Sequence, residues 1–134
     1  MIKTYIDKVA LVDIRDHKVL MALSRGKERW FNPGGKIEQG ETKEQALVRE
    51  IREELSVEIN SESIQHYGTF EAQAFGKPEG TFVRMYCYTA TYHGEPRPSS
   101  EIEKIEYFSY AARFRSTAVD LLIFADLKTK GLID

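Results

Sequence analysis

The stretch from Gly35 to Val57 constrains this 134-residue chain most, because it joins a glycine-containing loop to a strongly acidic segment with helical periodicity. A helix is predicted to begin after Thr42, since threonine is a favoured N-cap and Gln45 stands where a capping box needs Glu or Gln. Apolar residues at positions 46, 47, 51 and 55 recur at three- and four-residue steps. One face of this helix should therefore pack against a core.

The other face of the predicted helix concentrates carboxylates. At about 100° per residue, Glu53 and Glu54 lie about 60° to one side and about 40° to the other side of Glu50. Like charges at this spacing destabilise a helix by a few tenths of a kcal/mol per pair unless a cation offsets them. Arg49 can offset part of the repulsion, and a bound metal the rest. Carboxylate oxygens suit Mg²⁺ or Mn²⁺, hard cations that also bind phosphate directly.

The loop 33–36, Pro-Gly-Gly-Lys, completes the pattern. Gly34 and Gly35 let the backbone approach closely and turn a carbonyl toward a metal, and Lys36 is placed to meet a phosphate oxygen. An acidic helix face by itself is most often a solvated surface. The glycine loop at a fixed distance from the carboxylates favours a metal and phosphate site instead.

These residues resemble the Nudix box, G-x5-E-x7-R-E-U-x-E-E-x-G-U, in which U is aliphatic. The matching residues are Gly35, Glu41, Arg49, Glu50, Ile51, Glu53, Glu54 and Val57. Ser56 stands where the pattern has glycine, so the helix must end in a less comfortable left-handed conformation or in another way. The resemblance implies a single domain over residues 1–134, with the box at 35–57. It also implies an α/β fold, an α/β/α sandwich with a mixed β-sheet between helices.

The chemistry that the resemblance implies is divalent-metal-dependent hydrolysis of the pyrophosphate linkage in a nucleoside diphosphate linked to another group. A nucleoside triphosphate or a related small nucleotide is the expected substrate, in a nucleotide-sanitising role. The alternative is a non-catalytic Nudix module that senses a nucleotide. A sensor is free to lose the glutamates, so their presence favours the enzyme.

The resemblance also assigns roles to individual residues. The expected metal ligands are the carbonyl of Gly34 and the side chains of Glu53 and Glu54, with Glu50 as a further ligand or the general base. Arg49 is expected to orient the glutamates by ion pairing, and Glu41 to steady the junction between loop and helix. These last two act on the metal ligands rather than on the metal itself.

Many such enzymes take one more glutamate from a loop after the last long strand. Glu101 is the best candidate for a ligand or catalytic base, with Glu103 and Glu106 as competitors, and the alternative for all three is an exposed edge strand. Arg25, at the end of a predicted strand, is either a phosphate clamp or an ordinary surface arginine.

Three residues just before the glycine loop are candidates for substrate binding. Trp30 and Phe31 either stack on a nucleobase or pack in the core. Asn32 either reads a base edge or makes a turn. The Nudix branch that removes oxidised guanine nucleotides reads the base with an asparagine near the C-terminal helix. Residues 111–134 contain none, which argues against that substrate.

Hydrophobic alternation and turn residues predict the remaining elements. A hairpin is expected from strands at 5–14 and 18–24, a short strand at 29–32, two strands at 64–75 and 81–92, a loop at 94–100, a strand at 102–110 and a helix at 117–127. The order of these elements agrees with the fold that the box implies.

Composition and net charge limit the kinds of binding partner to be expected. A net charge of −2 gives no general attraction to nucleic acid backbones or anionic membranes, so a small nucleotide is expected rather than a long nucleic acid. Cys87 is the only cysteine, which excludes an internal disulfide. The chain has no long apolar run or leader pattern, so a cytoplasmic protein without a membrane partner is expected. A homodimer is an expectation from the family alone.

Overall fold

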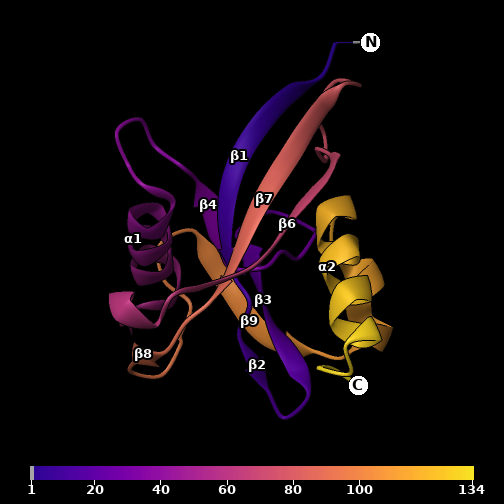
Figure 1. The fold of residues 1–134 in the computed structure, drawn as a ribbon. Coiled ribbons are helices and arrows are strands. Elements are labelled where there is room, and N and C mark those ends of the chain that lie inside the picture. The colour runs from indigo at the N-terminus through magenta and orange to yellow at the C-terminus, as the bar shows by residue number, and fades with distance from the viewer. Residues whose placement is uncertain (1) are drawn as a thin grey trace.

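The computed structural model describes residues 2–134 as twisted strands between two helices (Figure 1). The strands are β1 (Thr4–Leu11), β2 (Ile14–Arg15), β3 (Lys18–Ser24), β4 (Gly34–Lys36), β5 (Glu58–Ile59), β6 (Gln65–Gln73), β7 (Thr81–Thr89), β8 (Tyr92–His93) and β9 (Ile102–Phe108). The helices are α1 (Lys43–Leu55) and α2 (Ala118–Thr129), with short 3₁₀ helices η1 (Ser61–Ser63) and η2 (Tyr110–Arg115).

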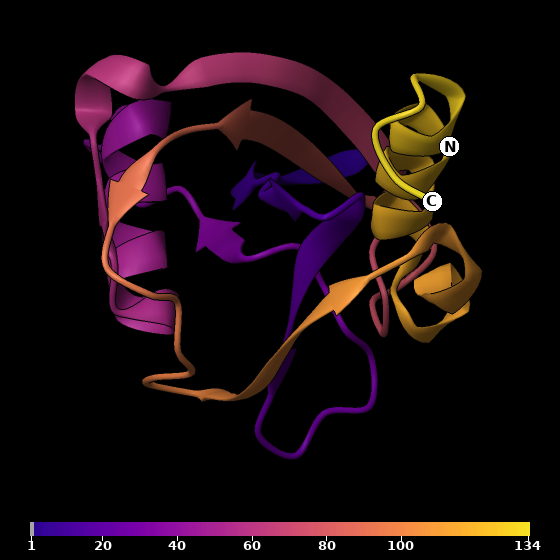
Figure 2. The ribbon, with the colours of Figure 1, turned by 90° about the horizontal axis from the view of Figure 1, so that it is seen from below.

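The largest sheet is mixed and has the strand order β4-β1-β7-β6. Its two central strands, β1 and β7, run parallel, whereas β4 and β6 pair antiparallel to their neighbours. Strands β2, β3 and β9 form a second, antiparallel sheet, and β5 pairs with β8. Helices α1 and α2 lie on opposite sides of the strands (Figures 1 and 2). The expected α/β/α sandwich with a mixed sheet is confirmed.

Strand β1 is buried on both faces and divides the core in two. Val9 and Leu11 pack with the apolar face of α1, whose buried residues include Leu47 and Ile51. Residues 10 and 12 point the other way and pack with residues 123, 124 and 127 of α2. Because side chains alternate along a strand, β1 contributes apolar side chains to the core under α1 and to the core under α2.

The predicted hairpin between residues 5–14 and 18–24 is wrong in its first strand. Only Ile14 and Arg15 pair with β3, through a turn at Asp16 and His17 with φ of 53° and 60°. The predicted strand is interrupted after Leu11. Its first part, β1, belongs to the other sheet, where it pairs with β4 and β7. A strand that is apolar on both faces belongs inside a sheet, so it needs neighbours on both edges.

The short strand predicted at 29–32 is also wrong. This segment makes only isolated bridges, Ala22 with Phe31 and Trp30 with Ser116, and the strand follows it as β4, where a loop was expected. Gly34 explains the position of β4. Its φ is 151°, and a Cβ there would lie 2.0 Å from the carbonyl oxygen of Val9 on β1. Only glycine lets β4 approach β1 this closely.

Both helices have the caps that a helix start requires. Thr42 and Gln45 form a reciprocal capping box at α1, as predicted, and Thr117 and Asp120 form another at α2. Helix α1 ends at Ser56, whose φ of 56° and ψ of 33° are left-handed. The departure from glycine therefore leaves a serine in a strained conformation and does not change where the helix stops.

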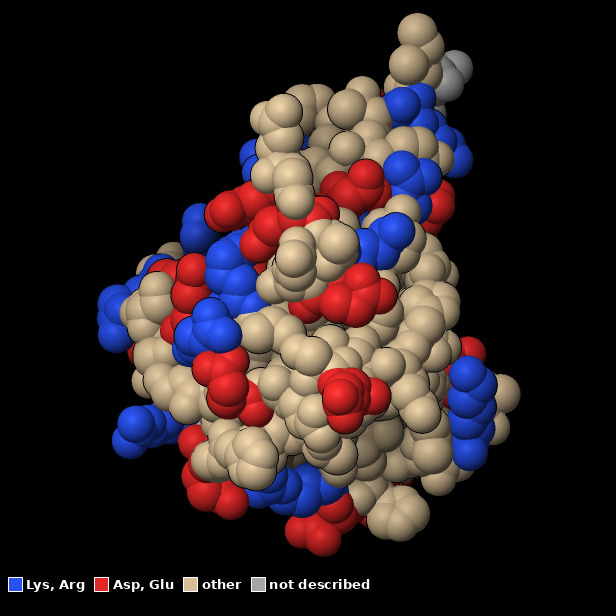
Figure 3. Space-filling model, turned by 60° about the vertical axis from the view of Figure 1, so that its left-hand side comes forward, with Lys and Arg blue, Asp and Glu red and all other residues tan. Residues whose placement is uncertain are grey.

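The surface that carries α1 alternates acidic and basic residues, so no extended patch of one sign covers that face (Figure 3). None of the helices within residues 2–134 is long and apolar enough to cross a membrane.

Candidate active site

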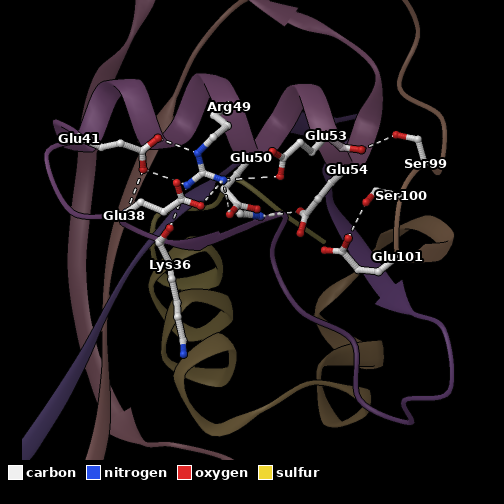
Figure 4. Close-up of polar contacts among 11 residues, drawn as sticks. Lys36, Glu38, Glu41, Arg49, Glu50, Glu53, Glu54, Ser99, Ser100 and Glu101 are labelled. Atoms are coloured by element: carbon white, nitrogen blue, oxygen red, sulfur yellow. Dashed lines mark hydrogen bonds and ion pairs between the residues drawn. The ribbon is translucent and has the colours of Figure 1, made fainter.

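Arg49 organises the acidic face of α1 (Figure 4). Its Nε and Nη2 bind the two carboxylate oxygens of Glu41 at 2.6 and 2.9 Å, and Nη2 also donates to the carbonyl of Lys36 at 3.1 Å. On its other side, Nη1 lies 2.9 Å from Glu50 and 3.5 Å from Glu53. One half-buried guanidinium thus joins the loop before the helix to the carboxylates on the helix.

Glu41 holds the junction that leads into α1. Its Oε1 also accepts the backbone N–H of Glu38 at 2.9 Å. These donors, the Arg49 guanidinium first, lower the pKa of Glu41 to about 2. Glu41 therefore stays charged, and it fixes the orientation of Arg49.

Glu54 is the most deeply placed carboxylate of the helix. Its side chain is 2% exposed, and Oε1 accepts the backbone N–H of Gly34 at 2.8 Å. Burial raises its pKa to about 9, and the negative charges of neighbouring glutamates add to this effect. Burial also raises the pKa of Glu50, against the opposing effect of Arg49. A further cation beside Glu50 and Glu54 would stabilise the charged form of both side chains.

Gly35 makes room for Glu50. A Cβ built on Gly35 would lie 2.6 Å from the carboxyl carbon of Glu50, closer than real Cβ contacts allow. The carboxylate therefore rests directly against the backbone of β4. The glycine of the box is needed here for this contact, since it has no left-handed φ.

Glu101 reaches the same site from the loop before β9. Its neighbour Ser99 binds the end of α1, with its N–H on the carbonyl of Glu54 at 3.0 Å and its hydroxyl on the carbonyl of Glu53. Ser100 Oγ donates to Glu101 Oε2 at 2.7 Å. The loop is therefore docked on the helix, and it carries the Glu101 carboxylate toward those of Glu50 and Glu54, whose pKa values its charge raises.

The competitors of Glu101 lie elsewhere. Glu106 pairs with Arg115 at 3.0 Å, and Glu103 is exposed on β9 and does not line the cleft. Arg25, predicted to be either a phosphate clamp or a surface arginine, is exposed and does not line the cleft. Its Nη1 donates to the carbonyl of Ser100 at 2.8 Å, and its N–H to the carbonyl of Glu101 at 2.8 Å. Arg25 thus ties β3 to the loop that carries Glu101.

The predicted donor set, carboxylate oxygens and the carbonyl of Gly34, fits a hard divalent cation in its chemistry. Burial raises the pKa of Glu54, and the charges of the neighbouring glutamates add to this. Arg49 is the cation that pairs with Glu50 and Glu53. Among residues 2–134, however, no three His, Cys, Asp or Glu side chains converge in an arrangement that would itself hold a metal. Glu50 and Glu53 each turn one oxygen toward Arg49, so a metal would compete with the guanidinium for these carboxylates.

A cleft of about 730 Å³ runs from these carboxylates to α2. It is lined by Ile6, Lys8, Ser24, Lys27, Glu28, Arg29, Phe31, Asn32, Gly34, Gly35, Lys36, Glu50, Glu54, Ala74, Phe75, Gly76, Lys77, Val83, Met85, Glu101, Thr117, Val119 and Asp120. Its volume suits a molecule of nucleotide size. Of the predicted substrate-binding residues, Phe31, Asn32, Gly35 and Lys36 line the cleft.

Trp30 does not line it. The indole is 6% exposed and packs against Phe108, with ring centroids 5.1 Å apart. Of the two interpretations of Trp30, core packing is the one that the structure shows. The side chains of Trp30 and Phe31 point to opposite sides of the same extended segment, which is why only one of them reaches the cleft.

Two polar residues of the cleft, Lys8 and Asp120, were not singled out from the sequence. Lys8 is a charged residue within the apolar run of β1, and Asp120 completes a Thr-x-x-Asp capping pattern with Thr117. The capping pattern was a usable signal for α2, but it says nothing about a cleft. Their approach to the site depends on how β1 and α2 pack.

Comparison with known proteins adds to this geometry. A model of the NUDIX domain matches residues 4–121. The 8-oxo-dGTP diphosphatase of Escherichia coli K12 is 39% identical over 64 residues, which are 48% of this chain and 46% of that protein. The CTP pyrophosphohydrolase of the same strain is 44% identical over 94 residues, or 66% and 65% of the two chains. The alignments thus span less than two thirds of either relative's length.

Solved structures agree on the fold. A MutT NUDIX hydrolase from Burkholderia pseudomallei superposes with a TM-score of 0.76 at 22% identity, covering 92% of this chain and 98% of that one. The solution structure of the E. coli ORF135 protein gives a TM-score of 0.73 at 24% identity, covering 96% and 94%. At such identities, the likeness concerns the fold alone.

Proposed function

This chain belongs to the NUDIX domain family, and from that premise we propose that it is a divalent-metal-dependent hydrolase of a nucleoside diphosphate linked to another group. The observation that carries the proposal is the presence of Glu50, Glu54 and Glu101 in one cleft of nucleotide size, beside the Gly34–Lys36 strand. We propose a nucleoside triphosphate or a related small nucleotide as substrate, in the cytoplasm. The names of the two E. coli relatives, an 8-oxo-dGTP diphosphatase and a CTP pyrophosphohydrolase, support this substrate class.

The proposed metal ligands are Glu50, Glu53, Glu54, Glu101 and the carbonyl of Gly34. Bound Mg²⁺ or Mn²⁺ would neutralise charge on the bridging phosphates and make a water molecule more acidic. Lys36, which lines the cleft, would bind a phosphate oxygen. Its side chain runs away from Arg49, so it can meet a phosphate without disturbing the pairs on the helix (Figure 4).

The protein's own groups also supply a base. Glu50 and Glu101 are the candidates to take a proton from the attacking water, since both are cleft carboxylates and Glu50 has a raised pKa. Arg49 would orient Glu50 and Glu53, and Glu41 would hold Arg49 in place. Glu54 is fixed by the Gly34 N–H and so keeps one oxygen pointed at the β4 backbone.

The test is release of phosphate and pyrophosphate from nucleoside triphosphates, oxidised nucleotides, dinucleoside polyphosphates and nucleotide sugars, with Mg²⁺ or Mn²⁺ and with chelator. Glu54→Gln is the disabling variant, and Glu62→Gln, on the exposed η1 turn, is the matched control. Metal-dependent cleavage that only Glu54→Gln abolishes would support the hydrolase. If no substrate of the panel is hydrolysed but nucleotides still raise the melting temperature, the protein is a nucleotide sensor and not a hydrolase.

A further inference from the structure

Two residues of one short segment are tied to opposite helices. The N–H of Gly34 donates to Glu54 on α1 at 2.8 Å, and the N–H of Asn32 donates to Asp120 on α2 at 3.1 Å. The cleft therefore has a carboxylate end against α1 and a second end against α2. The proposed hydrolysis uses the first end and leaves the second without a role.

The second end contains a buried amide with no partner. The Asn32 side chain is 1% exposed, and neither its Oδ1 nor its Nδ2 has a hydrogen-bond partner among residues 2–134. Buried polar groups are almost always paired, because an unpaired one loses its hydration without compensation. Since Asn32 lines the cleft, a bound molecule can supply the missing partners.

Asp120 fixes the backbone from which this amide projects. It is fully buried, and it accepts the Asn32 N–H through Oδ1 and the N–H and hydroxyl of Thr117 through Oδ2. With these contacts made, Asp120 is a positioning residue for Asn32. The side-chain amide is thereby held at the α2 end before any ligand arrives.

The surface beside Asn32 suits a planar ring. Ile6 pairs with Val83 and Lys8 pairs with Met85 across β1 and β7, and all four residues line the cleft. Three of them are apolar, and the fourth, Lys8, brings a half-buried amine. Burial lowers the pKa of Lys8, and the negative charge of Asp120 is the strongest effect that opposes this. An apolar floor with polar groups at one edge is how proteins bind heteroaromatic rings.

The chemistry of these polar groups distinguishes two kinds of base. An amide can pair with a lactam edge, C=O beside ring N–H, or with an amidine edge, ring N beside NH₂. A lactam oxygen has a second lone pair for an ammonium, whereas an exocyclic NH₂ offers only protons to it. A lysine in the same cleft as the amide therefore favours the lactam edge.

We propose that Asn32 selects the nucleobase of the substrate by pairing with a lactam edge, as in guanine or uracil, with Lys8 as a second donor to the keto oxygen. This inference rests on the proposed function in that the substrate is a nucleotide. It adds which part of the nucleotide the α2 end of the cleft binds and which bases it prefers.

The first experiment compares kcat/KM for GTP with ATP and for UTP with CTP, since each pair contrasts a lactam with an amidine edge. Wild type should prefer GTP and UTP by about tenfold or more, and Asn32→Leu should bring both ratios close to one through KM, with kcat little changed. Lys8→Met should lower the same ratios, and Asp120→Asn should lower them by displacing Asn32. Gln65→Leu, which removes an exposed amide on β6, is the control that keeps the wild-type ratios. Unchanged ratios in Asn32→Leu would overturn the proposal, as would a wild-type preference for ATP and CTP.

A second measurement separates this proposal from a structural role. Because the Asn32 amide is unpaired in the free protein, replacement by leucine should leave the melting temperature unchanged or raise it. A fall of several degrees would mean that the amide is already satisfied within the fold, and would overturn the proposal.

A third measurement is independent of hydrolysis. Binding of GMP, AMP, UMP and CMP in chelator, followed by calorimetry, should show the same order and the same dependence on Asn32. If that order appears while no nucleotide is hydrolysed, the proposed function fails and the base selection stands. If hydrolysis occurs but Asn32→Leu binds all four as wild type does, the base selection fails alone.

Discussion

The Nε of Arg49 lies 2.6 Å from Oε2 of Glu41, and this contact joins the loop before α1 to the carboxylate face of that helix. Arg49 has carboxylates on both sides, and Glu41 takes two of its nitrogens. The pair therefore decides how much of the guanidinium remains for Glu50 and Glu53. A bidentate arginine–carboxylate pair is well suited to this, since its geometry is fixed as well as its charge.

Glu41→Gln tests this relationship. The amide keeps the shape of the side chain but loses the charge, so Arg49 should turn further toward Glu50 and Glu53 and compete with a metal for them. We expect turnover and apparent Mg²⁺ affinity to fall roughly 10- to 100-fold, the usual cost of losing a group that orients metal ligands. Steady-state kinetics against Mg²⁺ concentration measure both. Glu38→Gln, at an exposed carboxylate 3.7 Å from Arg49, is the control and should change little. Equal effects of the two substitutions would contradict the role of Glu41.

Gly34→Ala and Gly35→Ala should separate folding from activity. A Cβ at position 34 would meet the Val9 backbone at 2.0 Å in a strained φ, so this variant should lose several kcal/mol of stability or fail to fold. The three atoms nearest to a Cβ at position 35 all belong to the Glu50 carboxylate, which can rotate away. Gly35→Ala should therefore fold and lose turnover, as measured by urea unfolding and steady-state kinetics. A Gly35→Ala protein with wild-type turnover would show that Glu50 does not need its place against β4.

The box allowed the fold class, the start of α1 and the carboxylate set to be predicted, because these depend on residues close in sequence. Thr42 and Gln45 cap the helix as expected, and Glu50 and Glu54 line one cleft. The pairing of β1 was not predictable in the same way. Its two neighbours come from residues 34–36 and 81–89, and periodicity records burial but does not say which strand lies alongside.

Contacts between residues far apart in the sequence were equally unpredictable at the α2 end of the cleft. Asn32 could be named as a base reader or a turn residue, but its burial without a partner follows from Asp120, 88 positions later. Arg25 had the residue type of a phosphate clamp, yet its guanidinium binds the loop at Ser100. Side-chain type predicts what a residue is able to bind, whereas the packing of distant elements decides what it meets.

Glu54→Gln separates metal binding from folding. Glu54 is buried and its pKa is raised, so a neutral side chain of the same shape can accept the Gly34 N–H with little loss of stability in chelator. Turnover should fall by roughly two to three orders of magnitude, because a charged ligand worth several kcal/mol is lost. Thermal melts should show Mg²⁺ raising the melting temperature of wild type but not of the variant. Magnesium-dependent stabilisation that survives in Glu54→Gln would remove Glu54 from the ligand set.

Ser56→Gly should stabilise the protein without changing its activity. Ser56 has a left-handed φ of 56° at the end of α1, a conformation that costs a residue with a Cβ roughly 1 kcal/mol more than glycine. Denaturant unfolding should report a gain of about that size, partly offset by the extra freedom of glycine in the unfolded chain. Kinetic parameters should stay at wild-type values, since the side chain of Ser56 is exposed and does not line the cleft. A loss of stability would mean that the left-handed conformation is not strained.

Asp120 gives the stability of the fold an unusual pH dependence. Burial raises its pKa from 3.8 to about 6, although Thr117, Asn32 and the charge of Lys8 oppose this. The native state therefore holds a proton between pH 4 and 6 that the unfolded state has released. The stabilising contribution of this group is complete below pH 4, and it is lost as the pH rises through 6. This is the reverse of the usual effect of a paired carboxylate.

Asp120→Asn isolates this contribution, because the amide does not titrate while the other carboxylates remain. The variant will lose acceptor contacts to Thr117 at every pH, so the informative quantity is the difference in free energy of unfolding, wild type minus variant. That difference should grow by up to about 3 kcal/mol as the pH falls from 7 to 4, since each pKa unit corresponds to about 1.4 kcal/mol. Urea unfolding at four pH values across this range measures it. A difference that is flat, or that shrinks on acidification, would show that Asp120 is held as a carboxylate down to its ordinary pKa and that its hydrogen bonds outweigh its burial.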